Sequence, residues 1–265
     1  MKTIFDHYDK ALLADLPRVT FPGRIVVVIS QAEAIKAVDY LLKQSILGFD
    51  TETKPSFARG RGMNKVALLQ VATHDTCFLF RLNQIGLTDS IIRLLSDTRV
   101  TKVALSWHDD IHQLQRRREF QPGHFIELQK HCQEIGIEDM ALQKLYANLF
   151  GEKIAKGQQL SNWENDTLTP AQCNYASIDA WACIRIYEEI ERLRQSGDYQ
   201  LVHRELPVPP RCEKKEDDST KPSAERKSSS RSRSKGKSKG RKSEKKVTKR
   251  KKTKDTNDQS ISSKR

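Results

Sequence analysis

Four acidic side chains stand in three short patches of the chain, and three of the four occupy positions where a folded protein ordinarily places apolar groups. Asp50 and Glu52 follow the apolar run ILGF, Asp110 lies in ALSWHDDIHQL, and Asp179 lies in NYASIDAW. Gathering several carboxylates in one cleft is unfavourable unless divalent cations neutralise them. A fold that fits this sequence therefore has to bring the patches to one point, and the pattern predicts chemistry there.

The basic residues of the chain are concentrated at its C-terminal end. Residues 211–265 contain 22 Lys or Arg and 8 Asp or Glu, a net charge of +14, out of 47 and 34 in the whole chain, so residues 1–210 carry a net charge of −1. Val247 and Ile261 are the only large aliphatic residues after Val208. Such a segment buries too little surface to offset its ordering entropy, and we expect residues 206–265 to form a disordered Lys/Arg/Ser-rich tail.

Within the tail, residues 228–254 alternate Ser or Gly with Lys or Arg. This pattern predicts a sequence-independent contact with the phosphate backbone of nucleic acid, which would make binding sensitive to salt. A solubilising extension is the alternative. In a eukaryotic cell the same run could serve as a nuclear localisation signal.

The N-terminal sequence MKTIFDHYDKALLADLP carries acidic residues where a signal peptide would have an apolar run, and no stretch approaches ~20 apolar residues. The five cysteines show no CxxC spacing, so we expect free thiols in a reducing compartment and no zinc site. These features predict an intracellular protein without a membrane segment. A cytoplasmic location in a bacterium is favoured, and a nuclear location stays open for a eukaryotic source. The oligomeric state is not predicted.

The body of the chain has an α/β pattern that follows an N-terminal extension, residues 1–23. We expect strands at 25–29, 46–49, 66–72, 77–80, 102–105 and 125–128, with a hairpin turn at 73–76, and helices at 31–42, 89–95, 140–150 and about 169–194. Ser30 with Glu33, and Thr169 with Gln172, are the expected capping pairs, and Pro170 is the expected first residue of the last helix. Strands that first form a meander and then alternate with helices indicate a mixed β-sheet flanked by helices.

Each acidic patch has a predicted place in this pattern. Asp50 and Glu52 are two residues apart at the end of a strand, so both point to the same face. On the last helix, Asp179 lies in the apolar stripe one turn after Tyr175, where the two can present a phenol and a carboxylate to one point. In the third patch, one of Asp109 and Asp110 is expected to cap the helix N-terminus.

Taken together, these patches resemble the DEDD superfamily of 3′–5′ exonucleases, of the ribonuclease D and Werner-exonuclease type, which also proofread in family A DNA polymerases. The strand-end DxE motif corresponds to Asp50-Thr51-Glu52, and the YxxxD motif of the last helix corresponds to Tyr175–Asp179. Alignment of the helix start with the second motif favours Asp110 as the functional acid and leaves Asp109 as the helix cap. The tyrosine places the chain in the DEDDy branch. The resemblance covers roughly residues 24–194 and includes the run Leu160-Ser161-Asn162-Trp163.

The resemblance implies an RNase H-like fold for a 3′–5′ exonuclease domain at residues 24–205, with a central sheet of about five strands. It also implies a substrate, DNA or RNA with a free 3′ end, and a product, nucleoside 5′-monophosphates. Two divalent cations, Mg²⁺ or Mn²⁺, would be held by Asp50, Glu52, Asp110 and Asp179. Tyr175 would stay neutral and orient the attacking water.

The loop after the first motif offers candidates for contact with the substrate. Phe57 could stack on a base, and Arg59 or Arg61 could contact phosphate, although a flexible basic loop without such a role is equally compatible with the sequence. Two alternatives to a 3′–5′ exonuclease that acts on DNA or RNA stay open. One is a ribonuclease D-like exoribonuclease that trims RNA, and the other is a catalytically silent module that binds nucleic acid.

Overall fold

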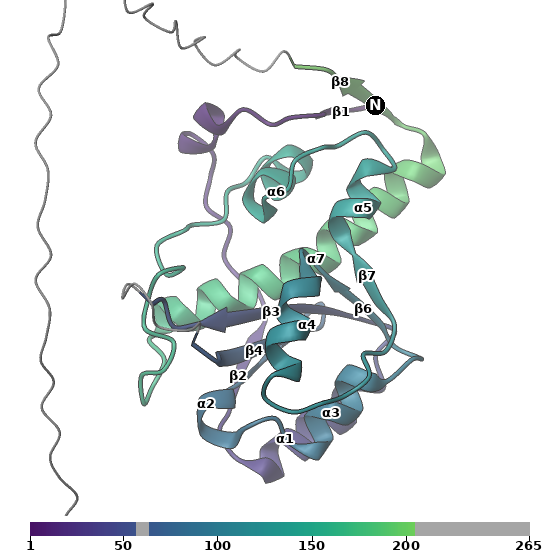
Figure 1. Ribbon diagram of the computed structural model, residues 1–265. Helices are drawn as coiled ribbons and strands as arrows, with labels where there is room; N and C mark the ends of the chain where they lie inside the picture. The colour runs from purple at the N-terminus through teal and green to yellow at the C-terminus, as the bar shows by residue number, and fades with distance from the viewer. Residues whose placement is uncertain (57–63, 205–265) are drawn as a thin grey trace, which may run out of the picture. The chain divides into compact units, whose positions relative to one another are not determined.

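The computed structural model describes residues 1–56 and 64–204 (Figure 1). The predicted tail, residues 206–265, and the loop residues Phe57, Arg59 and Arg61 lie outside the described residues.

The elements alternate along the chain much as the sequence pattern predicts. The strands are β1 (Lys2–Phe5), β2 (Arg24–Val28), β3 (Ile46–Thr53), β4 (Val66–Ala72), β5 (Thr76–Phe80), β6 (Thr101–Ala104), β7 (Phe125–Glu127) and β8 (Tyr199–Val202). The helices are the 3₁₀ turn η1 (Lys10–Ala14), α1 (Gln31–Leu41), α2 (Leu82–Ile85), α3 (Asp89–Ser96), α4 (Trp107–Gln115), α5 (Leu128–Gln133), α6 (Leu142–Phe150) and α7 (Pro170–Ser196).

Six strands form one mixed sheet in the order β2-β5-β4-β3-β6-β7. The pairs β3–β4 and β4–β5 are antiparallel, and β2–β5, β3–β6 and β6–β7 are parallel. The predicted hairpin through residues 73–76 joins β4 to β5. The mixed sheet predicted from the sequence is confirmed, with six strands where the resemblance implied about five.

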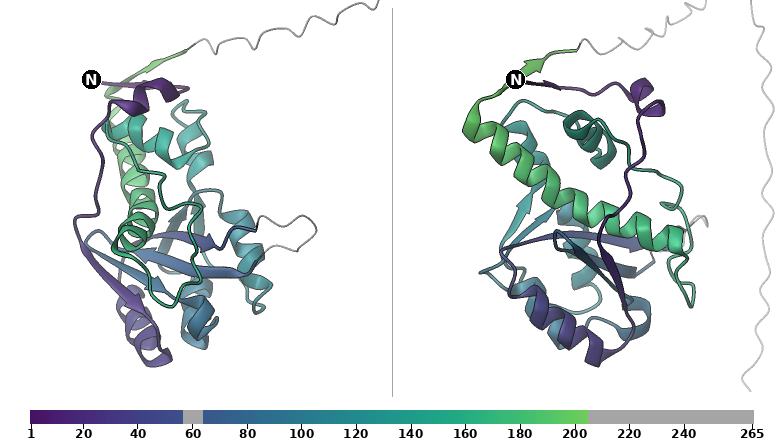
Figure 2. Two further views of the ribbon diagram at one scale, coloured as in Figure 1. Left: turned by 90° about the vertical axis from the view of Figure 1, so that its left-hand side faces the viewer. Right: turned by 180° about the vertical axis from the view of Figure 1, so that it is seen from behind.

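Helices cover both faces of this sheet (Figures 1 and 2). Alternate residues of β3 enter two separate hydrophobic clusters: Ile46 packs with side chains of α5, α6 and α7, and Leu47 and Phe49 pack with side chains of α1, α3 and α4. Side chains alternate between the two faces of the sheet along β3. Asp50 and Glu52 therefore lie on the same face as Ile46, the face that packs against α7.

Both helix starts that the sequence specified most fully are confirmed. Ser30 caps α1 and forms a capping box with Glu33. Thr169 caps α7 in the same manner with Gln172, and Pro170 is the first helical residue. The predicted apolar stripe of α7, which includes Ile178 and Ile186, is buried.

The N-terminal segment packs against the rest of the described chain. Strand β1 pairs in parallel with β8, which follows α7, and the two form a separate two-stranded sheet (Figure 2). The pattern of residues in the sequence does not predict either strand. Among the described residues, no helix combines the length and apolar composition needed to cross a lipid bilayer.

Candidate active site

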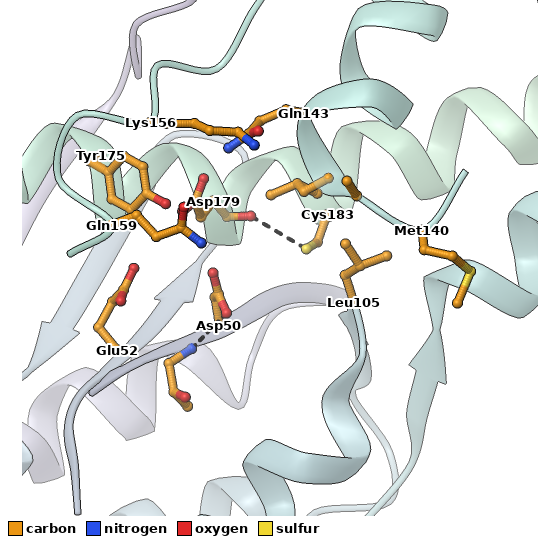
Figure 3. A pocket seen from close by; sticks show the side chains of 13 residues that line it. Asp50, Glu52, Leu105, Met140, Gln143, Lys156, Gln159, Tyr175, Asp179 and Cys183 are labelled. Carbon is orange, nitrogen blue, oxygen red and sulfur yellow. Dashed lines mark hydrogen bonds between the residues drawn. The ribbon is translucent and has the colours of Figure 1, made fainter. Parts of the chain in front are cut away.

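Strand β3 supplies the first two acidic side chains of the site. Asp50 and Glu52 point from β3 toward α7 (Figure 3). Alternation along a strand directs the side chain of Thr51, between them, to the opposite face of the sheet. Both carboxylates are half-buried. The prediction that Asp50 and Glu52 share one face is therefore confirmed.

Helix α7 supplies the other two predicted groups. Tyr175 and Asp179 have 7% and 5% of their surfaces exposed and line the same pocket, about 320 Å³ in volume, as Asp50 and Glu52 (Figure 3). One turn farther along α7, the Cys183 thiol contacts the Asp179 carbonyl oxygen at 3.4 Å and the Phe49 carbonyl oxygen at 3.8 Å. The first contact lies within α7, and the second links this helix to β3 at the level of the site.

The segment before α7 fixes the position of Tyr175. Trp163 is fully buried, and its ring lies 6.1 Å from the Tyr175 ring. The Gln172 amide donates to Ser161 Oγ at 2.9 Å and to the Asn162 carbonyl at 3.2 Å. The run Leu160–Trp163, singled out in the sequence, therefore serves to hold the tyrosine in the pocket wall.

Asp110 lies beside this pocket and is not among its lining residues. It comes from α4, is half-buried, and accepts a hydrogen bond from the Thr51 hydroxyl. Asp109, the next residue, is exposed to solvent. Between the two, the structure favours Asp110 as the acid that belongs to the site.

The assignment of Asp109 as the helix cap is wrong. Helix α4 begins at Trp107, and its cap residue is Ser106, which has a left-handed backbone with φ 55° and makes no side-chain capping bond. The Glu127 carboxylate instead accepts from the Ser106 and Trp107 N–H groups at 2.8 and 2.9 Å. A residue from the end of β7 thus satisfies the first-turn donors, and Asp109 stays inside the helix.

The electrostatics of the pocket favour neutral carboxyls when no cation compensates their charge. Burial, together with the neighbouring charges of Asp179 and Asp110, raises the pKa of Asp50 well above its ordinary value. Burial, followed by the charges of Asp50, Asp179 and Asp110, raises the pKa of Glu52 to about 10. For Asp179, burial raises the pKa to about 7 against the opposing effect of the Tyr175 hydroxyl, and burial raises the pKa of Asp110 to about 6.

The donor chemistry of the pocket fits a hard divalent cation. Asp50, Glu52 and Asp179 offer carboxylate oxygens, the ligands that Mg²⁺ and Mn²⁺ prefer. A bound cation would offset the cost of burying these charges and the repulsion that Asp50 and Glu52 experience. In the part of the chain that the structure describes, no three His, Cys, Asp or Glu side chains form a ready ligand set for a metal ion. The assignment therefore rests on the type, burial and mutual repulsion of the donors.

The pocket also contains polar residues that the sequence analysis did not identify. Gln143, from the first turn of α6, and Lys156 lie together on the side of the pocket formed by α6 and the loop that follows it, and Gln159 lies between Tyr175 and Glu52 in the view of Figure 3. Lys156 and Gln159 lie just before the run Leu160–Trp163 in the sequence, and this proximity was the available signal for both. Gln143 is brought in by tertiary packing alone.

Comparison with known proteins places this arrangement in a family. Residues 25–194 match the family model described as 3′–5′ exonuclease, which covers more than half of the chain and includes all four acids and Tyr175.

Two relatives illustrate the match in sequence. The bifunctional 3′–5′ exonuclease/ATP-dependent helicase WRN of Mus musculus is 27% identical over 195 residues, which is 69% of this chain and 14% of that protein. The exonuclease 3′–5′ domain-containing protein 2 of Drosophila melanogaster is 32% identical over 151 residues, which is 56% of this chain and 25% of that protein. The chain therefore corresponds to a minor part of the length of these relatives.

Solved structures share the fold. The Nibbler EXO domain of Aedes aegypti has a TM-score of 0.59 at 24% identity, covering 67% of this chain and 91% of that one. The exoribonuclease RNase D of Escherichia coli has a TM-score of 0.58 at 18% identity, covering 65% and 46%. At these identities the likeness establishes the RNase H-like exonuclease fold.

Proposed function

The chain belongs to the 3′–5′ exonuclease family, and we propose that it hydrolyses nucleic acid from the 3′ end with the help of two divalent cations, releasing nucleoside 5′-monophosphates. The observation that carries this proposal is the convergence of Asp50, Glu52, Asp179 and Tyr175 in one pocket. These residues come from a strand and a helix more than 120 positions apart in the sequence. Packing alone gives no reason to bury three acids together.

The carboxylates would serve as cation ligands. Asp50, Glu52 and Asp179 would hold one cation, and Asp50 with Asp110 would support the second, directly or through water. When bound, Mg²⁺ or Mn²⁺ activates water at neutral pH and stabilises negative charge on the leaving 3′ oxygen. Thr51 has a supporting part, because its hydroxyl fixes the Asp110 carboxylate next to β3.

Tyr175 would act as a neutral group. Burial, followed by the charges of Asp179 and Glu52, raises the pKa of the Tyr175 phenol above its ordinary value, so the hydroxyl keeps its proton across the physiological range. A protonated phenol can donate one hydrogen bond and accept others, which suits it to orienting the attacking water. It would not act as a general base.

The basic tail would supply most of the long-range attraction for a polyanionic substrate. Residues 1–210 carry a net charge of −1 and the pocket is acidic, whereas residues 211–265 carry +14. We therefore expect a chain ending at Pro210 to retain cleavage but bind nucleic acid more weakly at low salt. The measurement is the slope of log affinity against log salt concentration for the full and shortened chains. Equal affinities and equal slopes would contradict a role of the tail in binding nucleic acid.

The proposed activity is tested by its direction and its product. Oligonucleotides of DNA and RNA, labelled at either the 3′ or the 5′ end, are incubated with the full chain in Mn²⁺, Mg²⁺ or EDTA. We expect a 3′ label to leave at once as a mononucleotide, a 5′ label to move down a ladder of shortening products, and EDTA to stop both. The comparison of DNA with RNA gives the sugar preference. Binding without cleavage under every condition would instead favour a silent binding module.

A further inference from the structure

A groove next to the acidic pocket has one wall built by the N-terminal segment, which lies outside the family match at residues 25–194. The groove has a volume of about 440 Å³ and combines lysines with aliphatic side chains, among them Lys10, Leu13, Lys144, Lys153, Ile154 and Lys156. It is continuous with the acidic pocket, because Ala141, Gln143 and Lys156 line both.

The groove and the pocket have opposite electrostatic character. Four lysines line the groove, whereas Asp50, Glu52 and Asp179 line the pocket. Among the described residues, the exposed side chains of Lys10 and Lys156 have no ion-pair or hydrogen-bond partner. Their ammonium groups are therefore available to an anionic ligand.

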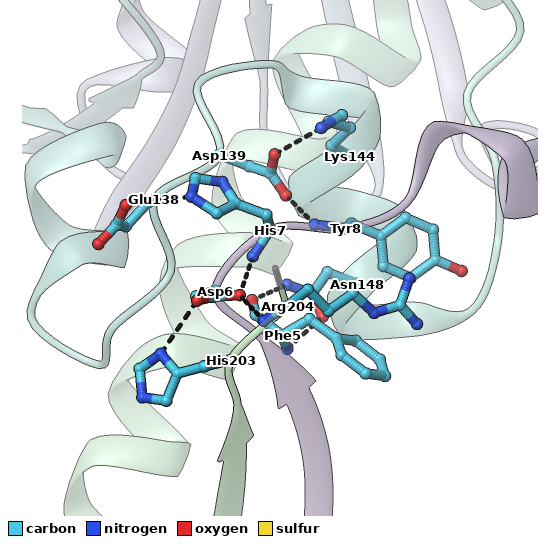
Figure 4. Close-up of polar contacts among 10 residues, drawn as sticks. All are labelled: Phe5, Asp6, His7, Tyr8, Glu138, Asp139, Lys144, Asn148, His203 and Arg204. Carbon is cyan, nitrogen blue, oxygen red and sulfur yellow. Dashed lines mark hydrogen bonds and ion pairs between the residues drawn. The ribbon is translucent and has the colours of Figure 1, made fainter. Parts of the chain in front are cut away.

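The N-terminal segment is tied to α6 and to the residues just before this helix (Figure 4). The Phe5 N–H donates to Asn148 Oδ1 at 3.0 Å, and Asn148 Nδ2 donates back to the Phe5 carbonyl at 2.7 Å. Asp139, with 5% of its surface exposed, accepts from the Tyr8 N–H at 2.6 Å and pairs with Lys144 at 2.8 Å. One buried carboxylate thus fixes both the N-terminal backbone and a lysine of the groove.

The loop that carries Lys156 is tied to the same segment. The Lys153 N–H donates to the Pro17 carbonyl at 2.8 Å, and the Val19 N–H donates to the Lys153 carbonyl at 3.1 Å. The Lys153 ammonium donates to the Ala14 carbonyl at the end of η1. The groove is therefore a built feature with walls held by backbone hydrogen bonds, rather than a chance space between surface side chains.

We propose that this groove holds the single-stranded nucleic acid that leads to the 3′-terminal nucleotide in the acidic pocket, with Lys10 and Lys156 on its phosphates. The inference rests on the proposed function, since it extends the same substrate beyond the bond that is cut. Leu13 and Ile154 offer the apolar contacts that sugars and bases require, and the lysines offer sequence-independent contacts to phosphate. The N-terminal segment would thus be part of the substrate-binding surface.

The test compares substrates of different length in the full chain. Steady-state kinetics with Mn²⁺ are measured on a dinucleotide, whose single phosphate lies at the acidic pocket, and on a 12-nucleotide single strand with the same 3′ end. The variant is Lys10→Glu. The matched control is Lys43→Glu, an exposed lysine after α1 that lines neither the groove nor the pocket.

At ~0.1 M salt, Lys10→Glu should raise KM for the 12-mer roughly five-fold more than KM for the dinucleotide. One phosphate contact on a single strand contributes about 0.7 to the log–log salt slope, which corresponds to a factor of about 5 in affinity at that salt concentration. The slope for 12-mer binding, measured by fluorescence anisotropy in EDTA, should fall by about 0.7. Lys43→Glu should change neither the KM ratio nor the slope.

The failures of the two proposals are distinguishable. If the wild-type protein cleaves both substrates and Lys10→Glu behaves like Lys43→Glu in the KM ratio and in the salt slope, the groove assignment is overturned and the exonuclease stands. If the wild type cleaves neither substrate, the exonuclease proposal fails. In that case the salt slopes of 12-mer binding, measured by anisotropy, test the groove assignment without cleavage. A slope that Lys10→Glu leaves unchanged would overturn the groove assignment in that case too.

Discussion

Gly48 of β3 lies directly against the backbone of Ala180 in α7. A Cβ atom at position 48 would stand 1.9 Å from the Ala180 carbonyl oxygen, far inside van der Waals contact. The absence of a side chain at this one position lets the helix approach the strand closely. Because Asp50 is two residues from Gly48 and Asp179 precedes Ala180, the same contact sets how near the two acids come.

Gly48→Ala should therefore damage both the fold and the site. The obstacle is backbone rather than a flexible side chain, so α7 has to shift, at a cost of about 3 kcal/mol in the free energy of unfolding. A displacement of Asp179 by about 1 Å from Asp50 would lower the rate of cleavage on the order of 100-fold. Chemical denaturation and single-turnover cleavage measure the two effects.

Gly157→Ala is the matched control, because a Cβ atom there has no neighbour within 4 Å. We expect it to alter neither quantity by much. Equal behaviour of the two alanine variants would show that α7 does not need the close approach at Gly48.

The raised pKa values of the site carboxyls predict that the metal-free protein loses stability as the pH rises. Glu52, with an ordinary pKa of 4.5 and a folded value of about 10, holds in the native state a proton that the unfolded chain has released. Asp179 and Asp110 behave likewise up to about pH 7 and pH 6. Proton binding is thus greater in the native state, and the free energy of unfolding falls between pH 5 and pH 9.

Glu52→Gln should flatten this decline, and Glu119→Gln, at an exposed position on the surface, should leave it unchanged. Denaturant melts in EDTA at several pH values give the slope. Because cation binding displaces protons, Mn²⁺ should raise the melting temperature of the wild type more at pH 8 than at pH 6. A pH dependence that is the same for wild type and Glu52→Gln would contradict the electrostatic description of the pocket.

Tyr175→Phe removes the phenol hydroxyl and keeps the ring that packs near Trp163. We expect cleavage to slow roughly 10- to 100-fold through loss of water orientation, with little change in the Mn²⁺ concentration required. Tyr187→Phe, on the same helix outside the pocket, is the control and should cleave normally. A rate for Tyr175→Phe equal to that of the control would remove the tyrosine from the mechanism.

Much of the site could be predicted because its signals are local. The strand run before Asp50 and the apolar stripe around Asp179 each fix a face within a single element, and the capping residues of α7 fix where that helix begins. Local patterns failed where the partner is distant in sequence. Glu127, rather than Asp109, accepts the hydrogen bonds of the N–H groups at the start of α4. No local signal could reveal this, because the carboxylate comes from another strand.

The N-terminal segment shows the same limit on a larger scale. Strand β1 is four residues long and gains its partner, β8, from almost 200 positions away. Its alternation is too short to distinguish a strand from an extension, so its register and its contacts with α6 emerge only from the folded chain. The position of Lys10 beside the site depends on these contacts.

Single-turnover release of the 3′-terminal nucleotide shows whether Asp50 belongs to a metal-dependent active site. The assay compares wild type, Asp50→Asn and the matched control Asp109→Asn, an exposed acid that does not line the pocket. We expect Asp50→Asn to lose on the order of 10³-fold in rate at saturating Mn²⁺ with its fold intact, since the lost ligand supported several kcal/mol of charge stabilisation, and Asp109→Asn to cleave like wild type. Equal rates for wild type and Asp50→Asn would contradict the assignment of this pocket as the active site.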